Sequence, residues 1–148
     1  MKVSEVMTAP PVCVAPEDSL AEATRAMTRS AVGSLLVVED GALRGIVTDR
    51  DLAVRAWAAL DGQARVRAVM TADVLTVGAE DDLQAAYRKF RHTGVRRLPC
   101  CAGRGAGVLT IDDLFLDVLQ RLADLLGPVA WSVLQERPGR PGGTGPCG

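Results

Sequence analysis

The chain has 148 residues, 48% of them apolar and 24% charged, which suits one compact globular body or two small halves that need each other. Its net charge of −1 argues against broad binding to nucleic acid, because such binding needs a positive surface. No apolar run approaches the length of a membrane span, and the first pattern begins at Val3, which leaves no room for a signal peptide. We therefore expect a cytoplasmic protein without membrane contact, whose four cysteines are reduced thiols.

A long internal repeat dominates the sequence. Residues 3–9 read VSEVMTA and return 63 positions later, at 66–72, as VRAVMTA. After one residue is lost, GIVT at 45–48 returns as GVLT at 107–110. A period of about 60 residues is longer than that of a solenoid, so the pattern predicts two copies that pair face to face. The place where the copies meet, which we call the seam, should hold two quasi-equivalent clefts, and we expect function there.

The first copy reads as strand, helix, strand, strand, helix. Ser19 and Glu22 form a capping-box pattern that predicts the start of a helix. Asp40-Gly41 separates two apolar runs and predicts a hairpin turn. The expected elements are a helical turn at 3–7, strands at 12–14, 34–39 and 43–47, a helix from residue 20, and a helix from Thr48 to about Leu60.

The second copy repeats this order. Its first helix places Leu83, Ala86, Tyr87 and Phe90 on one face, and Gly94 is its expected end. Its last helix is predicted from about Ile111 to Leu126, with Gly127-Pro128 ending it. Residues 129–134 form an ambiguous apolar patch, and 137–148 are too rich in Gly, Pro and Arg to order themselves.

These elements predict an α/β fold of the α+β type, with two β-α-β-β-α halves packed about a pseudo-two-fold axis. We expect the first repeat at residues 1–63, the second at 64–127, and a largely disordered tail at 128–148. Halves of about 60 residues are marginal alone, so each should depend on the other.

The repeated unit resembles the CBS domain. The resemblance lies in the V-M-T start, the amphipathic helix, and the pattern Gly-apolar-apolar-Thr-x-x-Asp-Leu that opens the last helix of each copy. Two such domains in tandem form a Bateman module, which often dimerises and in many cases binds AMP, ADP, ATP or S-adenosylmethionine at the seam. The resemblance implies a stand-alone bacterial CBS pair that senses such a ligand and regulates an unknown protein partner.

The two Thr-x-x-Asp motifs, Thr48 with Asp51 and Thr110 with Asp113, have two compatible interpretations. A threonine and an acid three residues later satisfy the free amides at a helix start, whatever the function. A helix start after a strand also favours phosphate, and a nearby carboxylate can accept both hydrogen bonds of a ribose diol. The resemblance implies that the threonines face phosphate or ribose and that the aspartates hold the ribose hydroxyls.

The resemblance also implies the rest of the lining. Arg96 or Arg97 would neutralise phosphate, although a cationic run such as that at 88–104 is usually just a solvated face. Val12, Leu35, Leu75 and Leu98 would enclose adenine. The complete candidate site comprises Thr8, Val12, Leu35, Thr48, Asp51, Thr71, Leu75, Arg96, Arg97, Leu98, Pro99, Thr110 and Asp113. We favour the second copy, because its arginines are denser and it keeps Pro99, whereas residues 32–36 lack both features.

Nothing in the sequence pairs a nucleophile with a base, so we do not expect an enzyme. His92 is the only histidine, which makes a metal centre improbable, and Cys13, Cys100 and Cys101 are interpreted as small core residues. Two alternatives stay open: a dimeric scaffold with empty clefts, or a redox-responsive protein. The surplus apolar surface of residues 114–126, with Val54 and Trp57, predicts a homodimer.

Overall fold

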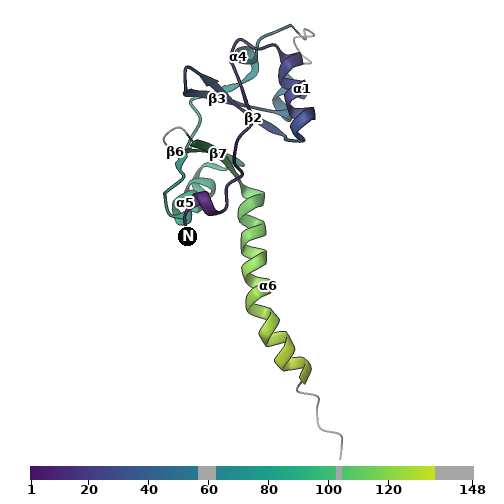
Figure 1. The fold of residues 1–148 in the computed structure, drawn as a ribbon, viewed down its shortest axis with the longest axis vertical. Helices are drawn as coiled ribbons and strands as arrows, with labels where there is room; N and C mark the ends of the chain where they lie inside the picture. Colours follow the sequence, from purple (N-terminus) through teal and green to yellow (C-terminus); the bar gives the residue numbers. More distant parts are fainter. Residues whose placement is uncertain (57–62, 103–104, 136–148) are drawn as a thin grey trace, which may run out of the picture. The chain divides into compact units, whose positions relative to one another are not determined.

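The computed structural model describes residues 1–56, 63–102 and 105–135 (Figure 1). These residues fall into two units, Met1–Asp113 and Leu114–Gly148. The first unit holds the first repeat and also the second repeat up to the start of its last helix, so the seam and the candidate site belong to that unit. The second unit holds most of the last helix.

The first unit contains two small sheets, which hold the predicted strands and the additional strand β4. In the first sheet the order is β1 (Cys13–Val14), β2 (Ser34–Glu39), β3 (Ala42–Thr48) and β4 (Thr71–Ala72). In the second sheet it is β5 (Val77–Gly78), β6 (Arg97–Ala102) and β7 (Gly105–Thr110). In each repeat the first strand is parallel to the second, and the second and third form an antiparallel hairpin. The mixed α+β fold predicted from the repeat is confirmed.

The helix α1 (Leu20–Ser30) begins and ends on local signals that the sequence carries. The hydroxyl of Ser19 accepts a hydrogen bond from the Glu22 amide at 3.1 Å, and the Glu22 carboxylate accepts one from the Ser19 amide at 2.8 Å. Its counterpart α5 (Leu83–Thr93) ends at Gly94, whose φ of 69° is left-handed and suits glycine. The predicted capping box and helix end are therefore confirmed.

Each repeat begins with a segment that packs on the other repeat. The turn η1 (Val3–Glu5) at the start of the chain donates from the Val3 amide to the Asp81 carbonyl at 3.0 Å. The equivalent helix α4 (Val66–Val69) donates from the Val66 amide to the Asp18 carbonyl at 2.8 Å. The donors Val3 and Val66 are 63 residues apart, and so are the acceptors Asp18 and Asp81. Each repeat therefore packs its first segment on the other repeat, an arrangement that we call the exchange.

The exchange continues into the sheets. Thr71 in β4 pairs with Ile46 at the edge of β3, and Thr8 forms the equivalent antiparallel bridge with Val108 in β7. A Cβ atom on Gly45 would lie 2.5 Å from the Thr71 carbonyl oxygen, which leaves no room for a side chain. The repeated glycine of the Gly-apolar-apolar-Thr pattern is therefore needed where the exchanged segment crosses the strand.

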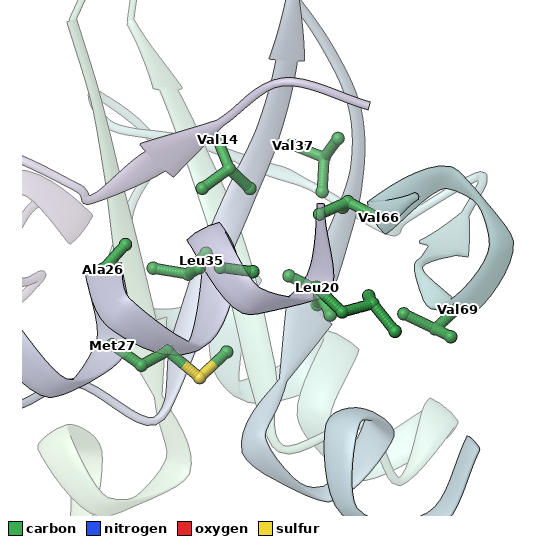
Figure 2. Packing of buried hydrophobic residues seen from close by; sticks show 10 residues of the cluster. Val14, Leu20, Ala26, Met27, Leu35, Val37, Val66 and Val69 are labelled. Atoms are coloured by element: carbon green, nitrogen blue, oxygen red, sulfur yellow. The ribbon is translucent and has the colours of Figure 1, made fainter. Parts of the chain in front are cut away.

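The core of the first repeat also crosses the repeat boundary (Figure 2). Leu35 and Val37 of β2 pack with one face of α1, and Val66 and Val69 of α4 complete the same cluster. Val66 is fully buried, as is its counterpart Val3. A cut between residues 63 and 64 would thus remove core side chains from the first repeat, which supports the predicted mutual dependence.

The last helices of the two repeats differ in length. In the first repeat, α2 (Asp49–Asp51) continues as a π-helical turn η2 (Leu52–Ala56), and residues 57–60 of the predicted helix, including Trp57, lie outside the described residues. In the second repeat, α6 (Ile111–Gln135) is one helix of 25 residues. No helix of the described ranges is long and apolar enough to cross a bilayer.

The predicted end of α6 at Gly127-Pro128 is wrong. Pro128 lies inside the helix, which continues to Gln135. Proline removes one backbone hydrogen bond, but its fixed φ is helical, and the apolar run at 129–134 extends the helix beyond it. The tail predicted from residue 128 is thus helical over its first part, and residues 136–148 lie outside the described residues.

Candidate functional site at the seam

The two Thr-x-x-Asp motifs occupy equivalent strand-to-helix junctions. At the first junction, between β3 and α2, the Thr48 hydroxyl accepts from the Asp51 amide at 3.1 Å and the Asp51 carboxylate accepts from the Thr48 amide at 3.0 Å. At the second junction, between β7 and α6, the same bonds join Thr110 and Asp113 at 3.0 and 2.8 Å. The predicted capping role is confirmed at both junctions.

Capping leaves part of each carboxylate for other partners. Each bond to a threonine amide uses Oδ2. At the first junction, Oδ1 of Asp51 stands 3.8 Å from Nε of Arg55. The second repeat has Asp117 at the position equivalent to Arg55, and Asp117 forms an ion pair with Arg121 at 3.0 Å. The second carboxylate therefore lacks the arginine that neutralises the first.

The start of each middle strand joins the junction of the same repeat. The Asp49 amide donates to the Gly33 carbonyl at 3.0 Å, and the Ile111 amide donates to the Arg96 carbonyl at the same distance. In the strand pairing, Arg97 stands opposite Thr110. The structure thus brings the backbone of both predicted arginines to the second junction.

The side chain of Arg97 reaches the first repeat. A Cβ atom on Gly33 would lie 3.4 Å from Nη2 of Arg97 and 3.2 Å from Oδ2 of Asp49. An arginine of the second repeat and an aspartate of the first therefore approach the same point at the first junction. Asp49 was not among the predicted site residues, although it directly follows Thr48 and has the apolar Ile111 as its counterpart.

The leucines predicted to enclose adenine belong to the interior. Leu35 and Leu98 are both 0% exposed, and Leu35 is part of the core under α1. Because side chains alternate along a strand, Leu35 faces the helix and cannot also face the seam. The predicted contact of Leu35 and Leu98 with adenine stays a prediction, and in this structure both side chains lie in the interior. Val12 is half-buried, Pro99 is buried, and Leu75 is 37% exposed.

The exchanged segments bring residues of both repeats to each sheet edge. Thr8 bonds to Val108, two residues before Thr110, and Thr71 pairs with Ile46, two residues before Thr48. The side chains of Thr8 and Thr71 are exposed. The sequence placed these threonines near the clefts but gave no sign that they add to the edge of the other repeat.

Two hollows lie next to residues of the candidate site. One, of about 280 Å³, lies at the edge of β3 and includes Val74 and Thr76 beside the candidate Leu75. The other, of about 320 Å³, has Asp49 of the first junction in its wall, and its further lining is Thr24, Met27, Thr28, Val32 and Leu52.

The cysteines differ from one another. Cys100 is buried, as predicted. Cys13 and Cys101 are exposed, so the predicted assignment of these two cysteines to the core is wrong. Neighbouring residues on a strand point to opposite faces, which separates Cys100 from Cys101. Burial raises the pKa of the Cys100 thiol to about 11, and burial also raises the pKa of Cys13. Within the described residues, no group of three His, Cys, Asp or Glu side chains could hold a metal ion.

Comparison with known proteins decides the family. The sequence profile of the CBS domain matches residues 3–56 and matches again at residues 66–119. The chain belongs to the CBS domain family. Each repeat is one CBS domain, and the exchanged turns and junctions described above are parts of a tandem CBS pair.

Individual relatives agree with this assignment. The CBS domain-containing protein YhcV of Bacillus subtilis is 33% identical over 114 residues, which cover 76% of this chain and 81% of YhcV. Inosine-5′-monophosphate dehydrogenase of Korarchaeum cryptofilum is 35% identical over 106 residues, which cover 70% of this chain but only 21% of that enzyme. The solved structure of CBSX2 in complex with AMP is 28% identical, with a TM-score of 0.68, and the match covers 80% of this chain and 96% of CBSX2.

Proposed function

We propose that this CBS pair is a regulatory module that binds an adenosine-containing ligand at the seam. The observation that carries the proposal is the second junction, where a strand ends in a capped helix start whose Ile111 amide bonds to the carbonyl of the exposed Arg96. CBSX2, a structural relative at 28% identity, is in complex with AMP. We propose sensing and not catalysis, since the match to the dehydrogenase covers only 21% of that enzyme.

Each group at the second junction has a task in this proposal. Asp113 uses Oδ2 to cap the helix, and a carboxylate has further lone pairs that can accept from a ribose diol. The Ile111 and Asp113 amides already donate to the Arg96 carbonyl and the Thr110 hydroxyl. The Thr110 hydroxyl is therefore the donor that faces phosphate, and Arg96 or Arg97 neutralises it. Thr8, bonded to Val108, is close enough in the sheet to border the same ligand. The equivalent groups at the first junction are Thr48, Asp51 and Thr71.

Calorimetric titration with AMP, ADP, ATP and S-adenosylmethionine tests the proposal. Loss of a charge-assisted hydrogen-bond pair costs on the order of 2–3 kcal/mol, so Asp113→Ala should weaken binding by about 30- to 150-fold. The matched control is Asp124→Ala, because Asp124 is exposed on the same helix and bonds only weakly to Gln120 at 3.4 Å. The control should bind as the wild type does.

Two results would contradict the proposal. A wild-type protein that gives neither heat nor thermal stabilisation with any of the four ligands at millimolar concentration has no such site. Normal binding by both Asp51→Ala and Asp113→Ala would mean that the carboxylates only cap helices.

We also propose that the protein is a homodimer joined through α6. Five apolar residues follow one another at alternating spacings of three and four along the helix, as on the contact face of a coiled coil. They are Phe115, Val118, Leu122, Leu125 and Val129, each between 44% and 67% exposed. Their spacing gives a second copy the same stripe to pack against. This surface also supports the alternative of a ligand-free scaffold, which the titration above distinguishes.

A further inference from the structure

The helix α6 carries a second apolar stripe beside the one that joins the proposed homodimer. The members of the first stripe are followed directly by further apolar residues: Phe115 by Leu116, Val118 by Leu119, Leu122 by Ala123, and Leu125 by Leu126. The second stripe therefore repeats the alternating spacing of three and four, one residue further along the helix. Successive residues of a helix are turned by about 100°, so the two stripes face directions about 100° apart.

The second stripe is exposed to the same degree as the first. Leu116, Leu119 and Leu126 are 64%, 45% and 49% exposed, within the range of the first stripe. A pair of helices shares one contact face, so a dimer through the first stripe would leave the second in water. Apolar surface that continues along a helix in this way is typical of a further contact.

The remaining side of α6 is polar, and its side chains bond along the helix. Arg121 forms an ion pair with Asp117 at 3.0 Å. Gln120 donates a hydrogen bond to Asp124 at 3.4 Å. This side carries two acids and one base, whereas helices that lie on membranes present a basic side to the lipid headgroups. The charge pattern therefore favours a protein neighbour over a bilayer.

The angle between the stripes indicates how many helices fit together. In a square four-helix bundle, each helix contacts two neighbours in directions about 90° apart, close to the angle between the two stripes. In a three-helix bundle these directions are about 60° apart, and a two-helix coil has only one contact. An apolar face wider than two heptad positions is also typical of bundles and not of a simple coiled coil.

We propose that α6 forms an intermolecular four-helix bundle, in which the first stripe joins two chains and the second joins two such dimers into a tetramer. This inference rests on the proposed homodimer and deepens it. The neighbours are further copies of this chain, because both stripes have the same spacing and every copy supplies both. Each stripe meets the same stripe of a neighbour across a two-fold axis, which closes the assembly at four chains. The side of Asp117 and Arg121 stays in solvent.

Light scattering and sedimentation of the full chain test the inference. The wild type at micromolar concentration should have about four times the mass of one chain. Leu119→Glu places a charge in the second stripe alone, so it should weaken the association of dimers by about thirtyfold or more and lower the mass to that of a dimer.

Two control variants separate loss of the contact from other effects. Gln120→Glu adds the same charge at the next residue, on the polar side, and should keep the tetramer. Leu119→Met keeps an apolar side chain of similar volume and should also keep it. Because Leu119 is 45% exposed in the single chain, Leu119→Glu should retain the fold, which circular dichroism checks.

Four results would overturn the inference. A wild type with the mass of a dimer would remove the tetramer and leave the proposed homodimer standing. If that dimer also floats with phosphatidylcholine vesicles, the second stripe binds a bilayer instead. A tetramer that persists in Leu119→Glu would show that the second stripe is not a contact. A monomeric wild type would remove both the tetramer and the homodimer.

Discussion

The two strand-to-helix junctions share their backbone architecture and differ in the side chains around it. Thr48–Asp51 and Thr110–Asp113 make the same two capping bonds, with distances that agree within 0.2 Å. Around them, Asp49 is replaced by Ile111, and Arg55 by Asp117. The residues that recur build the fold in both repeats, whereas those that do not recur give the two junctions different surroundings.

The largest expected effect concerns Val3 and Val66, through which each repeat depends on the other. Val3 and Val66 are fully buried in the repeat that does not contain them, so Val3→Asp and Val66→Asp should each leave a charge unpaired in the interior. We expect each change to cost at least about 3 kcal/mol, a large part of the stability of an ordinary domain. Urea unfolding followed by circular dichroism measures this cost.

The control for Val66→Asp is Ala68→Asp, because Ala68 is an exposed residue of the same α4 helix. It should leave the unfolding midpoint nearly unchanged. A Val66→Asp protein with the wild-type midpoint would show that the repeats fold independently.

A substitution in α6, the last helix of the second repeat, tests the proposed homodimer. Leu122 lies on the apolar stripe of α6 and is 48% exposed, whereas Gln120 lies on its polar side. Leu122→Glu should weaken a homodimer by about 2 kcal/mol or more, roughly thirtyfold, since it places charges in the packed interface. Gln120→Glu should not. Light scattering that shows a monomer for the wild type at micromolar concentration would remove the dimer from the account.

The caps should be equal in energy if the junctions share one scaffold. Thr48→Ala and Thr110→Ala each remove one hydroxyl acceptor, so each should lower the free energy of unfolding by about 1 kcal/mol. Chemical denaturation of both variants measures the difference. A cost at only one junction would show that the geometric match is not an energetic one.

The smallest expected effect concerns Cys100, which replaces a valine of the first repeat. With its pKa raised to about 11 by burial, this thiol remains protonated at pH 8 and should react with iodoacetamide far more slowly than exposed Cys101. The unfolded chain, with a thiol pKa of about 9.0, loses this proton first, so stability should fall as the pH rises from about 9 to about 11. Mass spectrometry of alkylated peptides measures the difference; equal labelling of both cysteines would contradict it.

Much of this fold could be predicted because its signals are local. The Ser19 capping box, the Asp40-Gly41 turn and the Gly94 helix end each depend on a few neighbouring residues. The exchange of the Val3 and Val66 segments could not be predicted, since the repeat shows that two units exist but not which sheet edge each start joins. The path of α6 through Pro128 was missed because one proline can be absorbed when the apolar pattern continues beyond it.

The candidate site was predicted only in part. The Thr-Asp pairs were found because capping requires that spacing, and the arginines because they cluster. Leu35 was assigned to the ligand because periodicity does not distinguish the two covered faces of a buried strand. The approach of Arg97 to Asp49 joins residues of different repeats, which no pattern within one repeat could reveal.

A crystal structure of the protein grown with AMP would show whether the second junction is the ligand site. We expect density for the nucleotide at this junction, with both ribose hydroxyls about 3 Å from the Asp113 carboxylate and the phosphate near Arg96 or Arg97. A nucleotide bound away from Asp113, or no nucleotide at millimolar concentration, would contradict it.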